Sequence, residues 1–244
     1  KDTFKFDEIE SYFRKLLLEN IKIIPNTSKT EAELSDFNKQ YNLNLSFIAE
    51  NGSSIHGLNL IHANLPQKIS LSRPVDQINE IYNHHTPCEL KKKVIFISKL
   101  NTSEQEKIFG LPLAKIKLAL QRKHSIPIHF NGTEVEKNEF TKIINDAGLT
   151  IQTGGRVINI CDKVNKSIAL IKTLETIRSE IENEITTIGV GDNQNDLEML
   201  NVTDYSCLVK NDNFDSSLII KDNLIKSSEP SPQGWADVIK TAIQ

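Results

Sequence analysis

An apolar stretch followed at once by an acidic, amide-rich run constrains the fold of this chain more than any other feature. Residues 185–190 read Ile-Thr-Thr-Ile-Gly-Val, and residues 191–196 read Gly-Asp-Asn-Gln-Asn-Asp. A β-branched run that is apolar on both faces suits a parallel sheet covered by helices, in which ligands gather where the strands end. We therefore expect an α/β protein with a polar site at the end of this strand.

Three side chains of this run are candidate metal ligands. Asp192 would lie at the strand end, while Asn195 and Asp196 open the following helix. Hard oxygen donors of this kind suit Mg²⁺ far better than zinc. An acidic turn with helix-capping residues is the alternative, since Asp and Asn favour both roles.

Composition excludes several classes of partner. The 244 residues carry a net charge of -3 at pH 7. A nucleic acid or an anionic membrane would favour a basic face, so neither is expected as a partner. The cysteines Cys88, Cys161 and Cys207 are widely separated and lack metal-ligand spacing. We expect a cytoplasmic monomer or homodimer with reduced cysteines.

The first part of the chain alternates between helix and strand signals. The expected elements are a helix over 6–20, a strand over 21–24, a helix that opens at Thr30, a strand over 46–49 and a turn over 50–53. Apolar residues at helical spacing support the first helix, and Pro25 closes the first strand. Overlapping capping boxes, which begin at Ser28 and Thr30 and have a glutamate three residues later, mark the second helix.

The middle of the chain has a different pattern of expected helices and strands. It is expected to hold strands over 93–98, 125–130, 150–152 and 157–160, with helices near 75–83, 112–122 and 134–147. This grouping is typical of an α+β insert with an antiparallel sheet. Alternation then resumes with a helix over 165–179, the strand that ends at 190, a helix near 196–201, a strand over 205–209 and a last helix from about 234. The chain is predicted to consist of a core domain, 1–63 and 162–244, around an inserted domain, 64–161.

Two polar segments are expected to meet at one edge of the core sheet. Thr27 and Asp192 each follow a strand, and the ends of parallel strands share an edge. The helix that opens at Thr30 would turn its amides toward this edge, where the Thr27 and Ser28 hydroxyls add donors for a phosphate. A capped helix without a ligand is the alternative, because capping alone accounts for these residues.

Lys163 and Lys166 stand at the start of the helix after the insert. A cation at a helix N-terminus opposes the dipole and calls for an anion such as phosphate or carboxylate. Lys166 is the better candidate by its place in the helix. Alternatively, one or both lysines extend into water.

The combination of these motifs resembles the haloacid dehalogenase superfamily of phosphatases and, more narrowly, its mannosyl-3-phosphoglycerate phosphatase family. The matching segments are Thr27-Ser-Lys-Thr30 as the second motif, Phe47-Ile-Ala-Glu-Asn-Gly52, Lys166 as the third motif, Gly191 to Asp196 as the fourth, and a closing Pro-Gln-Gly-Trp235. The resemblance covers nearly the whole chain. It implies a Rossmann-like parallel sheet core, the haloacid dehalogenase fold, with an inserted α+β cap domain.

The resemblance also implies a magnesium-dependent phosphatase that works through an aspartyl-phosphate. An aspartate attacks phosphorus, a second carboxylic acid protonates the leaving alkoxide, and water hydrolyses the intermediate. By this analogy Thr27 binds a phosphate oxygen, and Lys166 pairs with the phosphate and the nucleophile. Asp192 ligates Mg²⁺, while Asn195 and Asp196 ligate it or hold its waters.

One motif of the family is absent. DxDGT, which supplies the nucleophile, the acid and a metal contact, does not occur in residues 1–244. The first core strand is missing with it, which would leave a gap in a close-packed sheet. The chain also begins with Lys1 rather than methionine. We therefore expect a strand with DxDGT before Lys1, rather than a decayed enzyme, and we expect residues 1–244 alone to be inactive.

The cap is expected to select the substrate, because it covers the phosphate site. Ser28, Lys29 and Asn51 in the matched core motifs are expected to contact the substrate. Arg122 and His124 lie in a cap run that resembles the family's basic cap motif, and both suit a glycerate carboxylate. An exposed basic helix end is the alternative for these two residues.

The expected substrate is mannosyl-3-phosphoglycerate, cleaved to mannosylglycerate and phosphate. Glucosyl-3-phosphoglycerate and sucrose phosphate are alternatives that one sequence does not separate. A catalytically silent phospho-ligand sensor or interaction protein is the alternative of a different class, and the missing nucleophile motif favours it.

The role of Asp192 is open to a direct test. We expect Asp192→Ala to abolish magnesium-dependent turnover, because the substitution removes a carboxylate from the predicted metal site. Phosphate release measured with and without Mg²⁺ checks this expectation. Activity retained by the variant would contradict the assignment.

Overall fold

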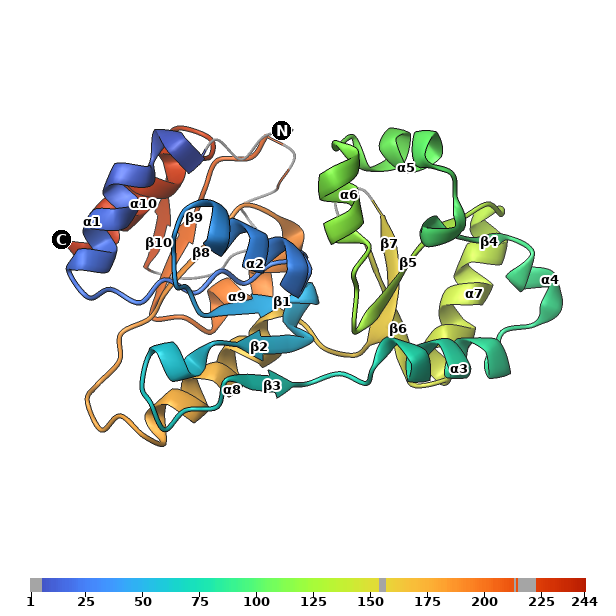
Figure 1. Cartoon of the computed structure of the whole chain (residues 1–244), viewed down its shortest axis with the longest axis horizontal. Helices are drawn as coiled ribbons and strands as arrows, with labels where there is room; N and C mark the ends of the chain where they lie inside the picture. The colour runs from blue at the N-terminus through green and yellow to red at the C-terminus, as the bar shows by residue number, and fades with distance from the viewer. Residues whose placement is uncertain (1–5, 154–156, 213, 215–222) are drawn as a thin grey trace.

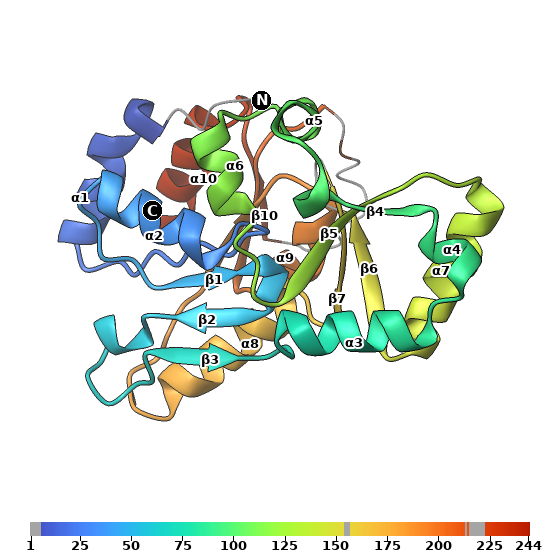
Figure 2. The ribbon, with the colours of Figure 1, turned by 45° about the vertical axis from the view of Figure 1, so that its right-hand side comes forward.

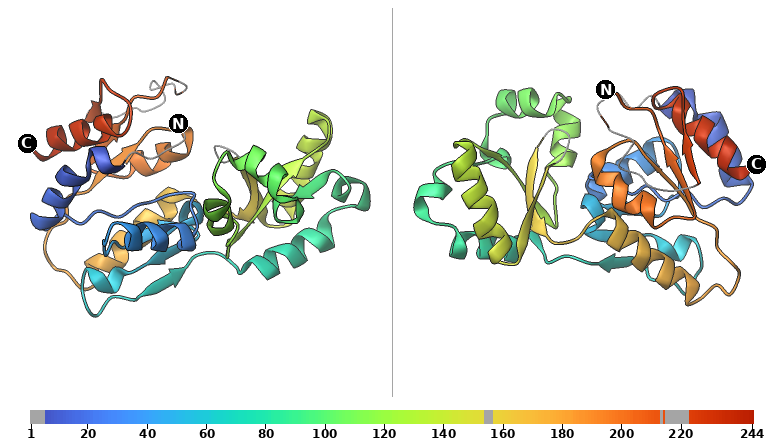
Figure 3. Two further views of the ribbon diagram at one scale, coloured as in Figure 1. Left: turned by 45° about the horizontal axis from the view of Figure 1, so that its top comes forward. Right: turned by 180° about the vertical axis from the view of Figure 1, so that it is seen from behind.

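The chain folds into two bodies joined by two connections (Figure 1). The computed structural model describes residues 6–153, 157–212, 214 and 223–244. One body, the core, holds the first and last segments of the chain. The other, the cap, contains everything from α3 to β7. The left view of Figure 3 shows the connections, which run from β3 to α3 and from β7 to α8. None of the described helices is long and apolar enough to cross a membrane.

The helices are α1 (Glu10–Leu18), α2 (Glu31–Gln40), α3 (Val75–His85), α4 (Cys88–Lys91), α5 (Thr102–Phe109), α6 (Leu113–Ala119), α7 (Glu134–Asp146), α8 (Lys166–Arg178), α9 (Leu197–Asn201) and α10 (Gln233–Ile243). The strands are β1 (Phe47–Ala49), β2 (Ser54–His56), β3 (Lys68–Ser70), β4 (Val94–Phe96), β5 (Ser125–Phe130), β6 (Leu149–Thr153), β7 (Ile158–Asp162), β8 (Ile188–Gly191), β9 (Tyr205–Leu208) and β10 (Leu224–Lys226). Short 3-10 helices include η1 (Phe6–Glu8), η2 (Glu50–Gly52), η3 (Leu58–Leu60), η4 (Ile97–Lys99) and η5 (Gln194–Asp196).

A parallel sheet in the order β10-β9-β8 forms one part of the core. Successive residues of β9 point to opposite faces. Cys207 accordingly packs with α1 and α10, whereas Leu208 packs with α9. Helices α1 and α10 lie side by side (Figure 1), and Trp235 stacks on Phe13 with 5.6 Å between ring centroids. Trp235 therefore packs α10 against α1.

A second core sheet, β1-β2-β3, is antiparallel and packs on α8. The expected strand over 21–24 was wrong, because no described residue pairs with that segment. The chain meets β1 only from Pro25, through Ile48 N to Pro25 O, Thr27 N to Ile48 O and a parallel bridge between Asn26 and Ile48. Ile21 and Ile23 instead pack beside β8 in a hydrophobic cluster.

The cap is built on an antiparallel sheet in the order β4-β5-β7-β6. Helices α3 and α7 cover one face, with Tyr82 and Phe140 packed on inward residues such as Ile160. The opposite face meets α5 and α6, and Val157 belongs to that cluster. Because side chains alternate along a strand, Asn159 and Cys161 share the face of Val157. In Figure 2, α6 lies between this face and α2 of the core.

The predicted architecture is confirmed: an α/β core with a parallel sheet is interrupted by an α+β insert with an antiparallel sheet. The elements that the sequence did not predict are β2, β3, α4, α5 and β10, which are three to eight residues long. Strand β3 extends the core sheet past residue 63, where the predicted boundary lies. The division into 1–63, 64–161 and 162–244 otherwise stays a prediction.

Gly52 sets the distance between the turn after β1 and the start of α8. Its φ is +102°, and a Cβ at this position would lie 2.1 Å from the backbone oxygen of Asn165. Gly148 offers a matched comparison, because its φ is +80° but a Cβ there would meet no atom within 4 Å. Both glycines need left-handed backbone, and only Gly52 also needs the space.

We expect Gly148→Ala to lower the free energy of unfolding by about 1–2 kcal/mol, the cost of left-handed backbone. Gly52→Ala should cost about 3 kcal/mol or more, since a backbone clash adds to the same cost. Urea unfolding followed by circular dichroism measures both. Equal losses in the two variants would contradict the close approach of α8 to this turn.

Candidate active site

A buried ion pair lies where β8 ends. Lys166 Nζ is 2.6 Å from Asp196 Oδ1, and both side chains are about nine-tenths buried. The other oxygen, Asp196 Oδ2, accepts hydrogen bonds from the amides of Asp192 and Asn193, each at 3.1 Å. Gly191 makes this possible, since a Cβ there would lie 2.4 Å from the Asp196 Cβ. The carboxylate therefore shapes the loop and neutralises the lysine.

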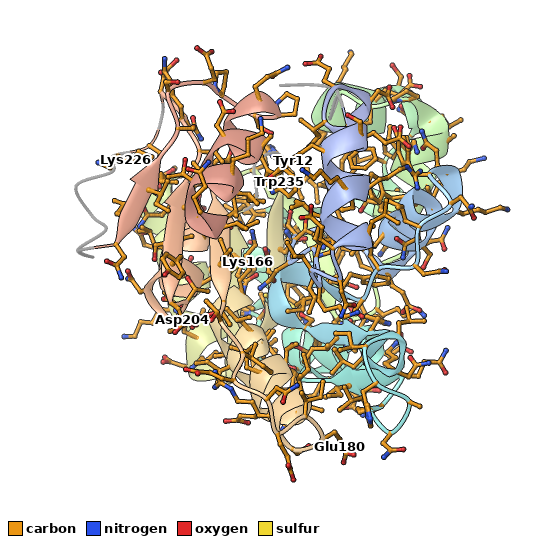
Figure 4. The ribbon with its side chains drawn as sticks, turned by 90° about the vertical axis from the view of Figure 1, so that its left-hand side faces the viewer. Tyr12, Lys166, Glu180, Asp204, Lys226 and Trp235 are labelled. Atoms are coloured by element: carbon orange, nitrogen blue, oxygen red, sulfur yellow. The ribbon has the colours of Figure 1, made fainter. Side chains whose placement is uncertain are left out.

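Helix α8 begins at this pair. Its N-cap is Asn165, whose side chain accepts from the amide of Ile168. Lys166 lies between the β8–β10 sheet and the turn after β1 (Figure 4). Lys163, the other lysine considered from the sequence, donates to the backbone oxygen of Asn145 in the cap. Of the two, only Lys166 reaches the loop after β8.

The donor chemistry at this loop fits a magnesium ion in part. Asp192 and Asn195 are exposed side chains with hard oxygen atoms. Both oxygens of Asp196 are already engaged by Lys166 and by the loop amides. Within the described residues no three His, Cys, Asp or Glu side chains gather to hold a metal. A magnesium site here needs further oxygen donors beside Asp192 and Asn195.

The loop that holds Thr27 is fixed beside the turn after β1. Asn51 N donates to Thr27 O, and Thr27 Oγ1 accepts from the amide of Lys29. Lys29 Nζ lies 3.1 Å from Glu33 Oε1. Of the two predicted capping boxes, the structure forms the one between Thr30 and Glu33.

Asn26 joins this loop to the ion pair. Its Nδ2 donates to the backbone oxygen of Lys166 at 2.9 Å, and its Oδ1 is buried with no partner among the described residues. Thr27 is the next residue, so the two polar segments expected at one edge of the core do lie together. The expected meeting of Thr27 with Lys166 and the Asp192 loop thus has a direct structural link.

Two cap residues predicted to bind substrate lie against the core. Arg122 Nη2 donates to the backbone oxygen of Ser28 at 3.2 Å. His124 Nδ1 lies 3.0 Å from the backbone oxygen of Arg73, and its Nε2 is buried without a partner in the described part of the chain. Neither side chain is exposed, in contrast to the alternative of a solvated basic helix end.

Other core and cap groups meet around these residues. Asn51 Nδ2 donates to Gln152 Oε1 of β6 at 3.1 Å. Thr30 Oγ1 donates to the backbone oxygen of Leu118. Burial acts to raise the pKa of Glu31, but hydrogen bonds from Lys123 of the cap and from Lys68 hold it below its ordinary value. Burial also lowers the pKa of the neighbouring His56 to about 4, so this imidazole is neutral at pH 7.

Sequence reasoning missed two carboxylates that join the bodies. Asp162 at the end of β7 accepts from the guanidinium of Arg73, which ties together the two connections between core and cap. Glu50 accepts from Lys123 and His124, which precede β5, and from Ser125, the first residue of β5. Glu50 stood inside the matched Glu-Asn-Gly segment, a usable signal, whereas no local pattern marks Arg73 and Asp162 as partners.

Comparison with known proteins shows the family that the motifs resemble. A family model described as haloacid dehalogenase-like hydrolase matches residues 3–226. The chain is 28% identical to a glucosyl-3-phosphoglycerate/mannosyl-3-phosphoglycerate phosphatase of Methanococcoides burtonii, with 99% of this chain and 92% of that protein covered. A protein of the same description from Persephonella marina is 22% identical, with 98% and 90% covered.

The fold is also similar to that of a solved structure. A solved haloacid dehalogenase-like hydrolase from B. subtilis superimposes with a TM-score of 0.63 at 15% identity, over 96% of this chain and 92% of that one. This likeness confirms the fold expected from the motifs. With the family model matched over most of its length, the chain belongs to the haloacid dehalogenase-like hydrolase family.

Proposed function

We propose that this protein is a magnesium-dependent phosphatase of a sugar phosphate ester, with mannosyl-3-phosphoglycerate as the favoured substrate. The observation that carries the proposal is the buried pair of Lys166 and Asp196 beside the Thr27 loop. A lysine held by a carboxylate at the end of a parallel strand is suited to an anionic substrate. The two relatives that are described as acting on glucosyl and mannosyl-3-phosphoglycerate support this choice of substrate.

In this proposal the chain's own residues bind and orient the phosphate. Lys166 neutralises phosphate charge, and Thr27 donates to a phosphate oxygen. Asp192 and Asn195 would hold Mg²⁺, which supplies charge neutralisation at the phosphoryl group when bound. Asp196 holds Lys166 and the loop amides, which favours its role as a support for the site.

In this proposal the nucleophile belongs to a DxDGT motif, which residues 1–244 do not contain. The arrangement of the core is compatible with such a strand. Within the described part of the chain β8 pairs only with β9, so its other edge has no strand partner there. A parallel strand on that edge would place its carboxyl end beside Asp192.

A second candidate function is a phospho-ligand sensor without turnover. The missing motif favours it, because a phosphate cradle without a nucleophile binds and does not cleave. Reading the codons before Lys1 separates the two candidates. An apolar strand followed by DxDGT supports the phosphatase, and a start codon directly before Lys1 would leave the sensor.

The substrate class can be measured directly. We expect protein expressed from its complete reading frame to release phosphate from mannosyl-3-phosphoglycerate faster than from glucosyl-3-phosphoglycerate, sucrose phosphate or simple sugar phosphates, and only with Mg²⁺. Steady-state kcat/KM for each ester, with a chelator control, checks this. A higher value for sucrose phosphate would reject the favoured substrate, and binding without phosphate release would favour the sensor.

Lys166 and Lys163 should behave differently when each is changed to methionine. Lys166→Met should abolish phosphate release and lower the free energy of unfolding by about 3–5 kcal/mol, because Asp196 keeps a buried charge without its partner. Lys163→Met, the control, should cost less than about 0.5 kcal/mol and keep turnover, since its contact is exposed. Activity lost in the control and kept in Lys166→Met would reverse the assignment.

A further inference from the structure

Glu50 is a buried carboxylate of the core whose hydrogen-bond donors come from the cap. Its side chain is 2% exposed. The amide of Lys123 donates to Oε1 at 2.8 Å, and the amide of His124 donates to Oε2 at 3.3 Å. Ser125 Oγ donates to Oε2 at 2.5 Å. One core side chain therefore accepts hydrogen bonds from three consecutive cap residues, the last of which begins β5.

The same carboxylate faces a buried guanidinium. Arg122 Nη1 lies 3.8 Å from Glu50 Oε2 and donates to Ser125 Oγ at 3.0 Å. Arg122 Nη2 reaches the backbone oxygen of Ser28. Nη1 therefore faces Glu50 and the Ser125 hydroxyl that Glu50 binds, and Nη2 faces the Thr27 loop. These contacts fix the plane of the guanidinium.

One donor of Arg122 stays unused. Its Nε is buried and has no hydrogen-bond partner among the residues that the structure describes. Burying an N–H group without an acceptor costs folding free energy. A bound ligand that supplies the acceptor is one explanation for such a group. An oxygen of a bound substrate would satisfy this donor, and a carboxylate would also offset the charge of the guanidinium.

The backbone at Glu50 supports a functional reason for this arrangement. Glu50 and Asn51 both adopt left-handed conformations, with φ of 48° and 57°. Non-glycine residues rarely do so, and such strain gathers where the surrounding structure enforces a particular geometry. Here it directs the Glu50 carboxylate across the boundary into the cap.

We propose that Glu50 is a positioning residue. It holds the cap against the core and orients Arg122, so that the free Nε–H selects phosphate esters with a carboxylate in the part beyond the phosphate. This inference rests on the proposed phosphatase function for its substrate and on the contacts above for its geometry.

Hydrogen exchange tests, without an activity assay, whether Glu50 holds these cap residues. In Glu50→Ala, and less in Glu50→Gln, protection of the Lys123 and His124 amides should fall by about 10- to 100-fold, as expected for lost hydrogen bonds to a charged group. Ser125→Ala, a milder change, should give a smaller loss. Asp36→Asn is the matched control, because Asp36 forms an exposed core–cap pair with Lys115 at 2.7 Å. In this variant the protection of the Lys123 and His124 amides should change less than about twofold.

Kinetics on protein from the complete reading frame test the selection. In Glu50→Gln the ratio of kcat/KM for mannosyl-3-phosphoglycerate to that for p-nitrophenyl phosphate should fall at least about tenfold, as expected for one charged contact. Arg122→Lys should lower the same ratio, since lysine keeps the charge and lacks Nε. An equal loss for both esters would reduce Glu50 to a structural role and overturn the proposal.

The outcomes separate the two proposals. Unchanged protection of the Lys123 and His124 amides in folded Glu50 variants overturns the positioning role, whatever the enzyme does. Failure of the wild-type protein to hydrolyse either ester refutes the phosphatase, and the exchange measurements then still decide whether Glu50 holds the cap.

Discussion

The buried ion pair between Lys166 and Asp196 is the interaction on which the rest of the core depends. Each charge would be costly to bury alone, so the first turn of α8 and the loop after β8 have to stay together. The second oxygen of Asp196 then orders the loop amides, while Asn26 binds the backbone of Lys166 and brings the Thr27 loop to the same place. One pair thereby gathers three segments that are distant in sequence.

The cap depends on a similar constraint at a second boundary. The Glu50 carboxylate is buried, and its hydrogen-bond donors among the described residues belong to the cap, so its burial favours the docked cap. Arg73 and Asp162 tie the two connections together at the base of the cap. The polar groups of the cap sheet that face the core, Gln152 among them, meet the turn that carries Glu50 and Asn51. The proposed site accordingly lies between the bodies, where the residues proposed to select the substrate also hold the cap.

Local patterns predicted the elements well where they were long or strongly marked. The capping box at Thr30 and Glu33 forms as expected, and the alternating apolar residues of β5 and β7 face the helices of the cap. The prediction of a strand over 21–24 was wrong because a strand needs a partner, and no described residue pairs with this segment. Short elements such as β2 and β10 carry too few residues for a periodic signal. Arg122 and His124 were identified as cap residues of interest, but their burial against the core was not predicted.

The sequence alone determined the α/β class, the inserted cap and the chemistry of the loop after β8, because these follow from residue type and spacing along one stretch of chain. Only the tertiary structure decided which groups became partners. It paired Lys166 rather than Lys163 with Asp196, engaged both oxygens of that aspartate, and set Glu50 against Arg122. The physical reason is that a buried charge is stabilised by whatever group the packing of distant segments brings within about 4 Å, a distance at which charges interact strongly.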